Sequence, residues 1–195
     1  LGTLYSRAEL LAIRRVCDTY GLYLFLDGAR LGFGLTAETA DVDLPDLAQL
    51  CDVFYIGGTK LGALMGEAVV IPRRELQEDF RYLIKRHGGM LAKGRLLGLQ
   101  FETLFTDGLY YEIGRHGNRM AKIIRDACWE KGYPFLVPPA TNQLFPILPN
   151  VLLERLKRDF AYSDQGPVGA DARAVRFCTS WATTQEMAEV LADAL

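Results

Sequence analysis

Residues 22–30 read Leu-Tyr-Leu-Phe-Leu-Asp-Gly-Ala-Arg, and residues 53–60 read Val-Phe-Tyr-Ile-Gly-Gly-Thr-Lys. Each segment begins with a continuous apolar run that is too short for a helix, which predicts a strand buried on both faces of a parallel sheet. Ligands of open parallel sheets bind at the carboxyl ends of the strands. Asp27, Arg30 and Lys60 therefore lie where a ligand site is expected.

The sequence around these two runs alternates between helix and strand patterns. Ser6 and Glu9 form a capping box that predicts a helix, and Gly21 predicts its end. A short helix is expected over 46–50, with Pro45 near its first turn, and a third strand over 68–71. Strand–helix–strand repeats indicate an α/β layer with right-handed crossovers. We assign residues 1–106 to this domain.

The pattern after Pro72 is helical, and a smaller α+β domain is expected over residues 107–195. Amphipathic helices are predicted at 76–84, 96–104 and 111–131. The small domain is predicted to contain an edge or bulged strand at 142–148, a helix at 151–157, a strand at 175–178 and a last helix capped by Thr183 and Glu186.

The composition is that of a folded protein without a strong charge bias. Of 195 residues, 50% are hydrophobic, and 22 Lys and Arg against 24 Asp and Glu give a net charge of -2, which disfavours nucleic acid as a partner. The four cysteines form no close pair, which is typical of reduced thiols in the cytoplasm. No apolar run approaches about 18 residues, so no membrane segment is expected. Because the chain enters structured sequence directly at Leu1, we expect a fragment.

A carboxylate and a lysine at neighbouring strand ends suit pyridoxal phosphate. The lysine amine can condense with the aldehyde, and the carboxylate can hold the pyridine nitrogen protonated. Taken singly, Asp27 in Asp-Gly is more typical of a turn, and Lys60 of a solvated lysine. The glycines at 32–34 lack the helix and acidic partner of a dinucleotide site, and two distant histidines do not predict a metal centre.

Several motifs together resemble the threonine aldolase group of fold-type I pyridoxal-phosphate enzymes, within the β-eliminating lyase superfamily. They are Asp-Gly-Ala-Arg-Leu-Gly at 27–32, Lys60 after an apolar strand, the opening residues 2–6, Thr141-Asn142, and Arg176 in Val-Arg-Phe-Cys-Thr-Ser-Trp. The resemblance implies the C-terminal part of a large parallel-sheet domain and a small domain. It also implies Lys60 as the Schiff-base lysine, Asp27 and Arg30 as cofactor-binding residues, and Arg176 as the residue that binds the substrate carboxylate.

The activity implied is cleavage of the Cα–Cβ bond of β-hydroxy amino acids to glycine and an aldehyde. Another β-eliminating lyase, or a truncated fragment without activity, are the alternatives. Two departures stand out: the chain reads Gly-Gly-Thr-Lys-Leu-Gly where common members have Ser before the lysine, and family chains are nearly twice as long. The resemblance therefore implies that an N-terminal half is absent, with its phosphate-binding loop, its ring-stacking residue and a general base.

The resemblance further implies a homodimer or homotetramer with active sites at a subunit interface. Lys85, Arg86 or His87 would then reach the phosphate of a neighbouring subunit's cofactor. The alternative is that these residues form only a cationic helix end that faces the helix dipole. His116 is expected on a solvated helix face.

Overall fold

The computed structural model describes residues 1–195, which divide into two units. The first unit consists of Tyr5–Leu35 and Ala40–Glu112, and the second of Leu1–Leu4, Thr36–Thr39 and Ile113–Leu195. No helix is both long enough and apolar enough to cross a bilayer. All four cysteines are free thiols; Cys17, Cys51 and Cys128 are buried and Cys178 is exposed.

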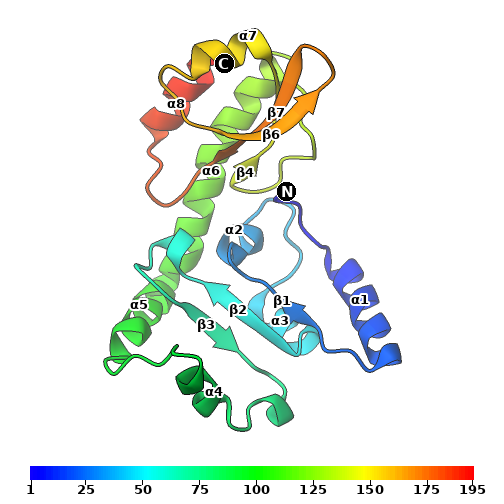
Figure 1. Cartoon of the computed structure of the whole chain (residues 1–195), viewed down its shortest axis with the longest axis vertical. Helices are drawn as coiled ribbons and strands as arrows, with labels where there is room; N and C mark the ends of the chain where they lie inside the picture. The colour runs from blue at the N-terminus through cyan, green and yellow to red at the C-terminus, as the bar shows by residue number, and fades with distance from the viewer. The chain divides into compact units, whose positions relative to one another are not determined.

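The first unit contains a three-stranded sheet and several helices (Figure 1). Its elements are α1 (Arg7–Tyr20), β1 (Phe25–Leu26), α2 (Leu31–Leu35), α3 (Leu44–Leu50), β2 (Val53–Gly57), β3 (Glu67–Val70), α4 (Phe80–Arg86) and α5 (Arg95–Phe105). Short 3-10 turns cover η1 (Thr59–Leu61), η2 (Arg74–Leu76) and η3 (Thr106–Gly108). The strand order is β1-β2-β3.

The predicted caps of the first helix are confirmed. Ser6 and Glu9 form the reciprocal capping box of α1, and Gly21 ends that helix at φ 64° in the left-handed region. The helix predicted at 46–50 begins two residues earlier, because Asp43 is its N-cap and forms a second capping box with Asp46.

Two expectations for the sheet need correction. The strand predicted over 22–26 is reduced to Phe25–Leu26, and the side chain of Phe25 is 59% exposed, because no element of this chain covers that face of the sheet. β1 and β2 are parallel, but β3 runs antiparallel to β2. The nine residues between β2 and β3 are too few for a parallel crossover, so the sheet is mixed.

The second unit is built around its longest strand. Its elements are α6 (Leu109–Glu130, which begins in the first unit), β4 (Gln143–Leu144), β5 (Ile147–Pro149), α7 (Asn150–Leu156), β6 (Ser163–Val168), β7 (Ala172–Cys178) and α8 (Gln185–Ala194). Strand β7 pairs antiparallel with β4, β5 and β6. The apolar core packs between these strands and α6, α7 and α8; its fully buried members include Leu148, Val175 and Cys128.

Details of the second unit differ from the prediction. The strand predicted at 142–148 is interrupted at Phe145–Pro146, which divides it into β4 and β5. Both pieces pair with β7 in one continuous register, so the bulge that Pro146 led us to expect is not formed. The N-cap of α8 is Thr184, not Thr183; its side chain accepts a hydrogen bond from Met187 N. Strand β6 was not predicted, because its sequence Ser-Asp-Gln-Gly-Pro-Val is polar and lacks a period-2 pattern.

A buried carboxylate joins the start of β1 to the start of β2. Asp52 is 2% exposed, and its Oδ2 accepts hydrogen bonds from Leu24 N at 2.5 Å and from Arg14 Nη1 at 2.7 Å. Arg73, which follows β3, pairs with Oδ1. Burial alone raises the pKa of Asp52, but these hydrogen bonds outweigh it and hold the pKa below its ordinary value.

Replacement of this carboxylate is expected to destabilise the first unit. Asp52→Asn should lower the free energy of unfolding by about 2–4 kcal/mol, because two arginines lose their buried partner. Since the pKa of Asp52 is lowered on folding, the difference from wild type should be full above about pH 4 and disappear at lower pH. Urea unfolding at several pH values measures it. Glu75→Gln, which removes an exposed partner of Arg73, should leave stability nearly unchanged.

Tyr110 connects α2 to the end of β2. Its side chain is fully buried, its hydroxyl donates to Gly57 O at 3.0 Å, and it accepts from Gly32 N at 3.1 Å. Burial raises the pKa of Tyr110, so the phenol stays protonated. A Cβ at Gly32 would lie 2.8 Å from the Tyr110 ring, so the helix and the ring pack in close contact.

Tyr110→Phe is expected to cost about 1–3 kcal/mol, because a buried carbonyl and a buried N–H each lose a partner. Tyr111→Phe is the matched control, since the Tyr111 hydroxyl makes no hydrogen bond. Thermal unfolding compares the two variants. Equal stability of both would contradict the role given to the Tyr110 hydroxyl.

Candidate functional site

The ends of β1 and β2 lie against each other with no room for side chains between them. Gly57 N donates to Gly28 O at 3.0 Å. A Cβ on Gly28 would lie 1.7 Å from Tyr55 O, and one on Gly57 would lie 2.5 Å from Ala29 O. Only glycine fits at these two positions. The close approach brings the residues that follow β1 beside the turn that follows β2.

Asp27 stands at the tip of β1 as an ionised acceptor. Its Oδ1 accepts hydrogen bonds from the Tyr55 hydroxyl and from Ala29 N at 3.0 Å. The Tyr55 bond is the main cause that lowers the pKa of Asp27, followed by the Ala29 bond, with further contributions from the charges of Lys60 and Arg30. Oδ2 makes no hydrogen bond, so one carboxylate oxygen remains available to a ligand.

Lys60 lies in the turn η1 directly after β2. The turn is anchored by Leu61, whose side chain is fully buried, and by Gly58 N, which donates to Glu67 Oε2 at 2.8 Å. The side chain of Lys60 is half-buried and has no carboxylate within ion-pair distance. Lys60 thus carries an amine that is held near Asp27 but is not committed to an ion pair.

Arg30 is the third residue of this cluster. It lies between β1 and α2, half-buried, and its Nε is buried without a hydrogen-bond partner. A buried guanidinium nitrogen without an acceptor is costly, and an anionic ligand oxygen would satisfy it. The structure therefore brings Asp27, Arg30 and Lys60 together at one end of the sheet. Asp27 supplies a hydrogen-bond acceptor, Arg30 a cation and Lys60 an amine.

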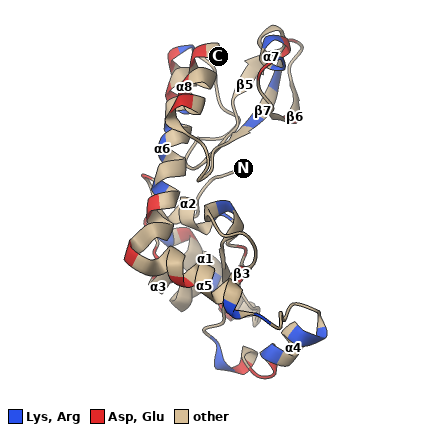
Figure 2. Ribbon diagram, turned by 90° about the vertical axis from the view of Figure 1, so that its left-hand side faces the viewer, with Lys and Arg blue, Asp and Glu red and all other residues tan.

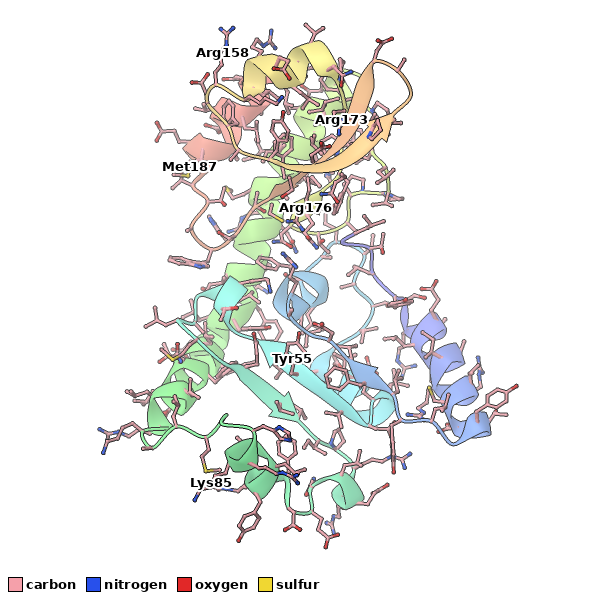
Figure 3. All side chains as sticks on the ribbon, in the orientation of Figure 1. Tyr55, Lys85, Arg158, Arg173, Arg176 and Met187 are labelled. Atoms are coloured by element: carbon pink, nitrogen blue, oxygen red, sulfur yellow. The ribbon has the colours of Figure 1, made fainter.

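Arg176 belongs to the second unit, where it lies on β7 (Figure 3). It is half-buried, stands opposite Ser163 of β6, and its Nη2 donates to Ser163 Oγ at 3.2 Å. No carboxylate lies within ion-pair distance, in contrast to Arg173 on the same strand, which pairs with Asp164 at 2.5 Å. The guanidinium of Arg176 therefore keeps most of its donors for another partner.

Lys85, Arg86 and His87 lie at the end of α4, with His87 as its C-cap. Figure 2 shows basic residues in blue on α4. No hydrogen bond or ion pair joins them to Asp27, Arg30 or Lys60. Lys85 lines an open groove of about 860 Å³, which also includes Arg95 and the apolar side chains of Met90 and Leu91. The end of α4 is therefore basic, and a contact with the phosphate of a neighbouring subunit's cofactor stays a prediction.

Some polar residues were missed or misjudged from the sequence. His116 is not simply solvated, because its Nε2 lies 2.8 Å from Thr183 O and so connects α6 to the loop before α8. Tyr55 and Glu67, which hold Asp27 and the η1 turn, were not predicted as part of the site. Side chains along β2 and β3 point alternately to the two faces of the sheet. This alternation shows which residues lie beside Asp27 only once the register between the strands is known.

Comparison with known proteins gives relatives over nearly the whole chain. The low specificity L-threonine aldolase of Pseudomonas aeruginosa is 30% identical over 198 residues, which cover 98% of this chain and 55% of that protein. Similar coverage is found for the enzyme of the same name from Pseudomonas sp., at 31% identity. The chain thus spans about half the length of the curated relatives it matches.

Solved structures agree with these relatives. The threonine aldolase of Leishmania major is 43% identical, with a TM-score of 0.96 over 98% of this chain and 56% of that chain. A putative L-allo-threonine aldolase from Listeria monocytogenes, 18% identical, has a TM-score of 0.72 and supports the fold alone. Residues 1–192 match the family described as beta-eliminating lyase, so the chain belongs to this family of enzymes that depend on pyridoxal phosphate.

Proposed function

We propose that the protein containing this chain is a lyase of the threonine aldolase type. It would cleave the Cα–Cβ bond of β-hydroxy amino acids to give glycine and an aldehyde, with residues 1–106 in its cofactor domain and 107–195 in its small domain. The observation that carries the proposal is the cluster of Asp27, Arg30 and Lys60 at the ends of β1 and β2. The names of the Pseudomonas and Leishmania relatives support the choice of reaction.

The residues of this cluster fit pyridoxal phosphate. The free Oδ2 of ionised Asp27 can accept a hydrogen bond from a protonated ring nitrogen, and the unpartnered Nε of Arg30 can donate to an anionic oxygen. When bound, the cofactor withdraws electrons from the substrate carbon that bears the amino group, so bonds to that carbon weaken. Asp27 maintains this property, because its negative charge favours protonation of the ring nitrogen.

Lys60 supplies the amine that binds the cofactor aldehyde. To act as a nucleophile this amine must be in its unprotonated form. The η1 turn limits how far Lys60 can move, because Leu61 is buried and Gly58 is bonded to Glu67. The amine is therefore presented from a fixed backbone.

Arg176 would bind the substrate carboxylate. A planar guanidinium can donate two parallel hydrogen bonds to a carboxylate, which fixes the orientation of the substrate and so the bond that breaks. Ser163 occupies one Nη2 direction and leaves the remaining donors available.

The assembly and location of the whole protein are further parts of this proposal. We expect a homodimer or homotetramer in which Lys85, Arg86 or His87 contacts the cofactor phosphate of a neighbouring subunit; the basic groove beside α4 supports this assignment. Exposed Leu96 and Leu99 on α5 supply apolar surface for such an interface. The free thiols support a cytoplasmic location.

Lys60→Ala should abolish the cofactor absorption band. In the whole protein with added pyridoxal phosphate, the wild type should absorb near ~420 nm, as expected when an amine condenses with the aldehyde, and the variant should not. Lys157→Ala, an exposed lysine of α7's C-terminal end, is the control and should keep the band.

The products from L-threonine then identify the reaction. Glycine and acetaldehyde are expected from the wild type, at a rate reduced by about three orders of magnitude or more in Lys60→Ala. Ammonia and a keto acid would instead indicate an eliminating lyase and overturn the aldolase assignment. Absence of both the band and any product in the wild type would mean that the protein is not an active enzyme.

Arg176→Lys should weaken substrate binding. Lysine keeps the charge but loses the bidentate geometry, so the KM for L-threonine should rise about tenfold or more. Arg173→Lys on the same strand is the matched control, because Arg173 is already paired with Asp164, and its KM should not change. Steady-state kinetics measure both; an unchanged KM in Arg176→Lys removes Arg176 from the site.

A further inference from the structure

We propose that Tyr55 is a positioning residue for Asp27, whose hydroxyl holds Oδ1 so that Oδ2 is presented to the ring nitrogen of the cofactor. The presentation of Oδ2 to a ring nitrogen rests on the proposed function, since it requires a bound pyridine ring. The hydrogen bond between Tyr55 and Asp27 does not depend on the cofactor. The proposed reaction does not by itself give Tyr55 a role.

The sheet places the two side chains on the same face. In the parallel register Phe25 stands opposite Val53 and Leu26 opposite Phe54, so one step further Asp27 stands beside Tyr55. The ring of Tyr55 also packs against that of Phe25, with centroids 6.1 Å apart and planes tilted by 39°. Strand β3 adds Val69 opposite Tyr55. Figure 3 shows Tyr55 on β2, within the sheet.

The two oxygens of Asp27 are used unequally. Oδ1 accepts a hydrogen bond from the Tyr55 hydroxyl of β2 and another from Ala29 N, two residues further along the chain. Two donors on a single oxygen fix the rotation of the carboxylate about its last bond. Oδ2 is then left in a defined direction, without a donor from this chain. Removal of the phenol would leave Ala29 N as the only donor, and the carboxylate could turn.

The charged groups around the pair keep it in the required protonation state. Asp27 faces Lys60 of the η1 turn and Arg30, and the phenol is also near Glu67 of β3. The bond to Asp27 is the largest cause that raises the pKa of Tyr55 to about 12, so this residue stays a donor over the physiological range. The same bond lowers the pKa of Asp27. Loss of the hydroxyl should therefore raise the pKa of Asp27.

The first test needs no cofactor. The carboxyl carbon of Asp27 is titrated by NMR in the whole apoprotein, in wild type and in Tyr55→Phe, which keeps the ring and its packing. The pKa of Asp27 should rise in the variant, because the hydrogen bond from the phenol is the largest cause that lowers it. Tyr23→Phe, an exposed tyrosine of the same unit, is the control and should leave the titration unchanged.

The second test joins Tyr55 to the cofactor. The dissociation constant of pyridoxal phosphate is expected to rise about tenfold in Tyr55→Phe, because an untethered carboxylate pairs less well with the ring nitrogen. In an Asp27→Asn background the same substitution should have no further effect, since a residue that acts through Asp27 cannot act without it.

The outcomes separate the two proposals. An unchanged Asp27 titration in Tyr55→Phe, or an equal loss of affinity in the Asp27→Asn background, overturns the positioning role. If the Asp27 titration shifts in Tyr55→Phe but the wild-type protein binds no pyridoxal phosphate, the proposed function is overturned. The last step of this inference then fails with it, whereas the hydrogen bond between Tyr55 and Asp27 stands. If Tyr55→Phe fails to fold, the phenol is titrated in Asp27→Asn: its pKa should fall from about 12 toward about 10, and no change overturns the inference.

Discussion

The buried carboxylate of Asp52 is the contact on which the geometry of the first unit depends. It accepts one hydrogen bond from Leu24 N, directly before β1, while Asp52 N donates to Leu24 O at 2.9 Å. These two hydrogen bonds fix the register between the starts of the parallel strands β1 and β2. The register that follows pairs Leu26 with Phe54, and two residues beyond β1 Gly28 O accepts from Gly57 N, the last residue of β2. Asp27 and the η1 turn lie close together because the strands are aligned at their opposite ends.

Asp52 also carries an energetic cost, which the chain offsets with two arginines from outside the sheet. Arg14 comes from α1 and Arg73 from the segment after β3, so the same carboxylate connects three parts of the sequence. An unpaired buried charge would be strongly destabilising, whereas the Asp52 carboxylate has donors on both of its oxygens: Leu24 N and Arg14 on Oδ2, and Arg73 on Oδ1. The network therefore favours one register of the strands over others. The cluster of Asp27, Arg30 and Lys60 at the carboxyl ends of the strands depends on this register.

Much of this arrangement could be predicted from residue patterns, but not all of it. The capping box of α1, the apolar run of β2 and the polar residues at the strand ends are local signals, and the strand ends located Asp27, Arg30 and Lys60. Tyr55 could not be assigned in the same way, because its contact with Asp27 exists only through the pairing of β1 with β2. The direction of β3 differs from the prediction, because the pattern of helices and strands indicates a parallel sheet, whereas the nine-residue link after β2 permits only an antiparallel neighbour. Exposure of Phe25 could not be foreseen from an apolar run, since burial depends on which elements lie above it.

The unequal burial of the four thiols gives the protein a practical property. Burial raises the pKa of Cys51 to about 11 and that of Cys128 to about 12, so neither forms a reactive thiolate near neutral pH, and Cys17 is also buried. Cys178 is the exposed thiol, at the end of β7 and two residues beyond Arg176. A maleimide dye or spin label added to the unmodified chain would therefore attach at this single position, and would report on the strand that carries Arg176.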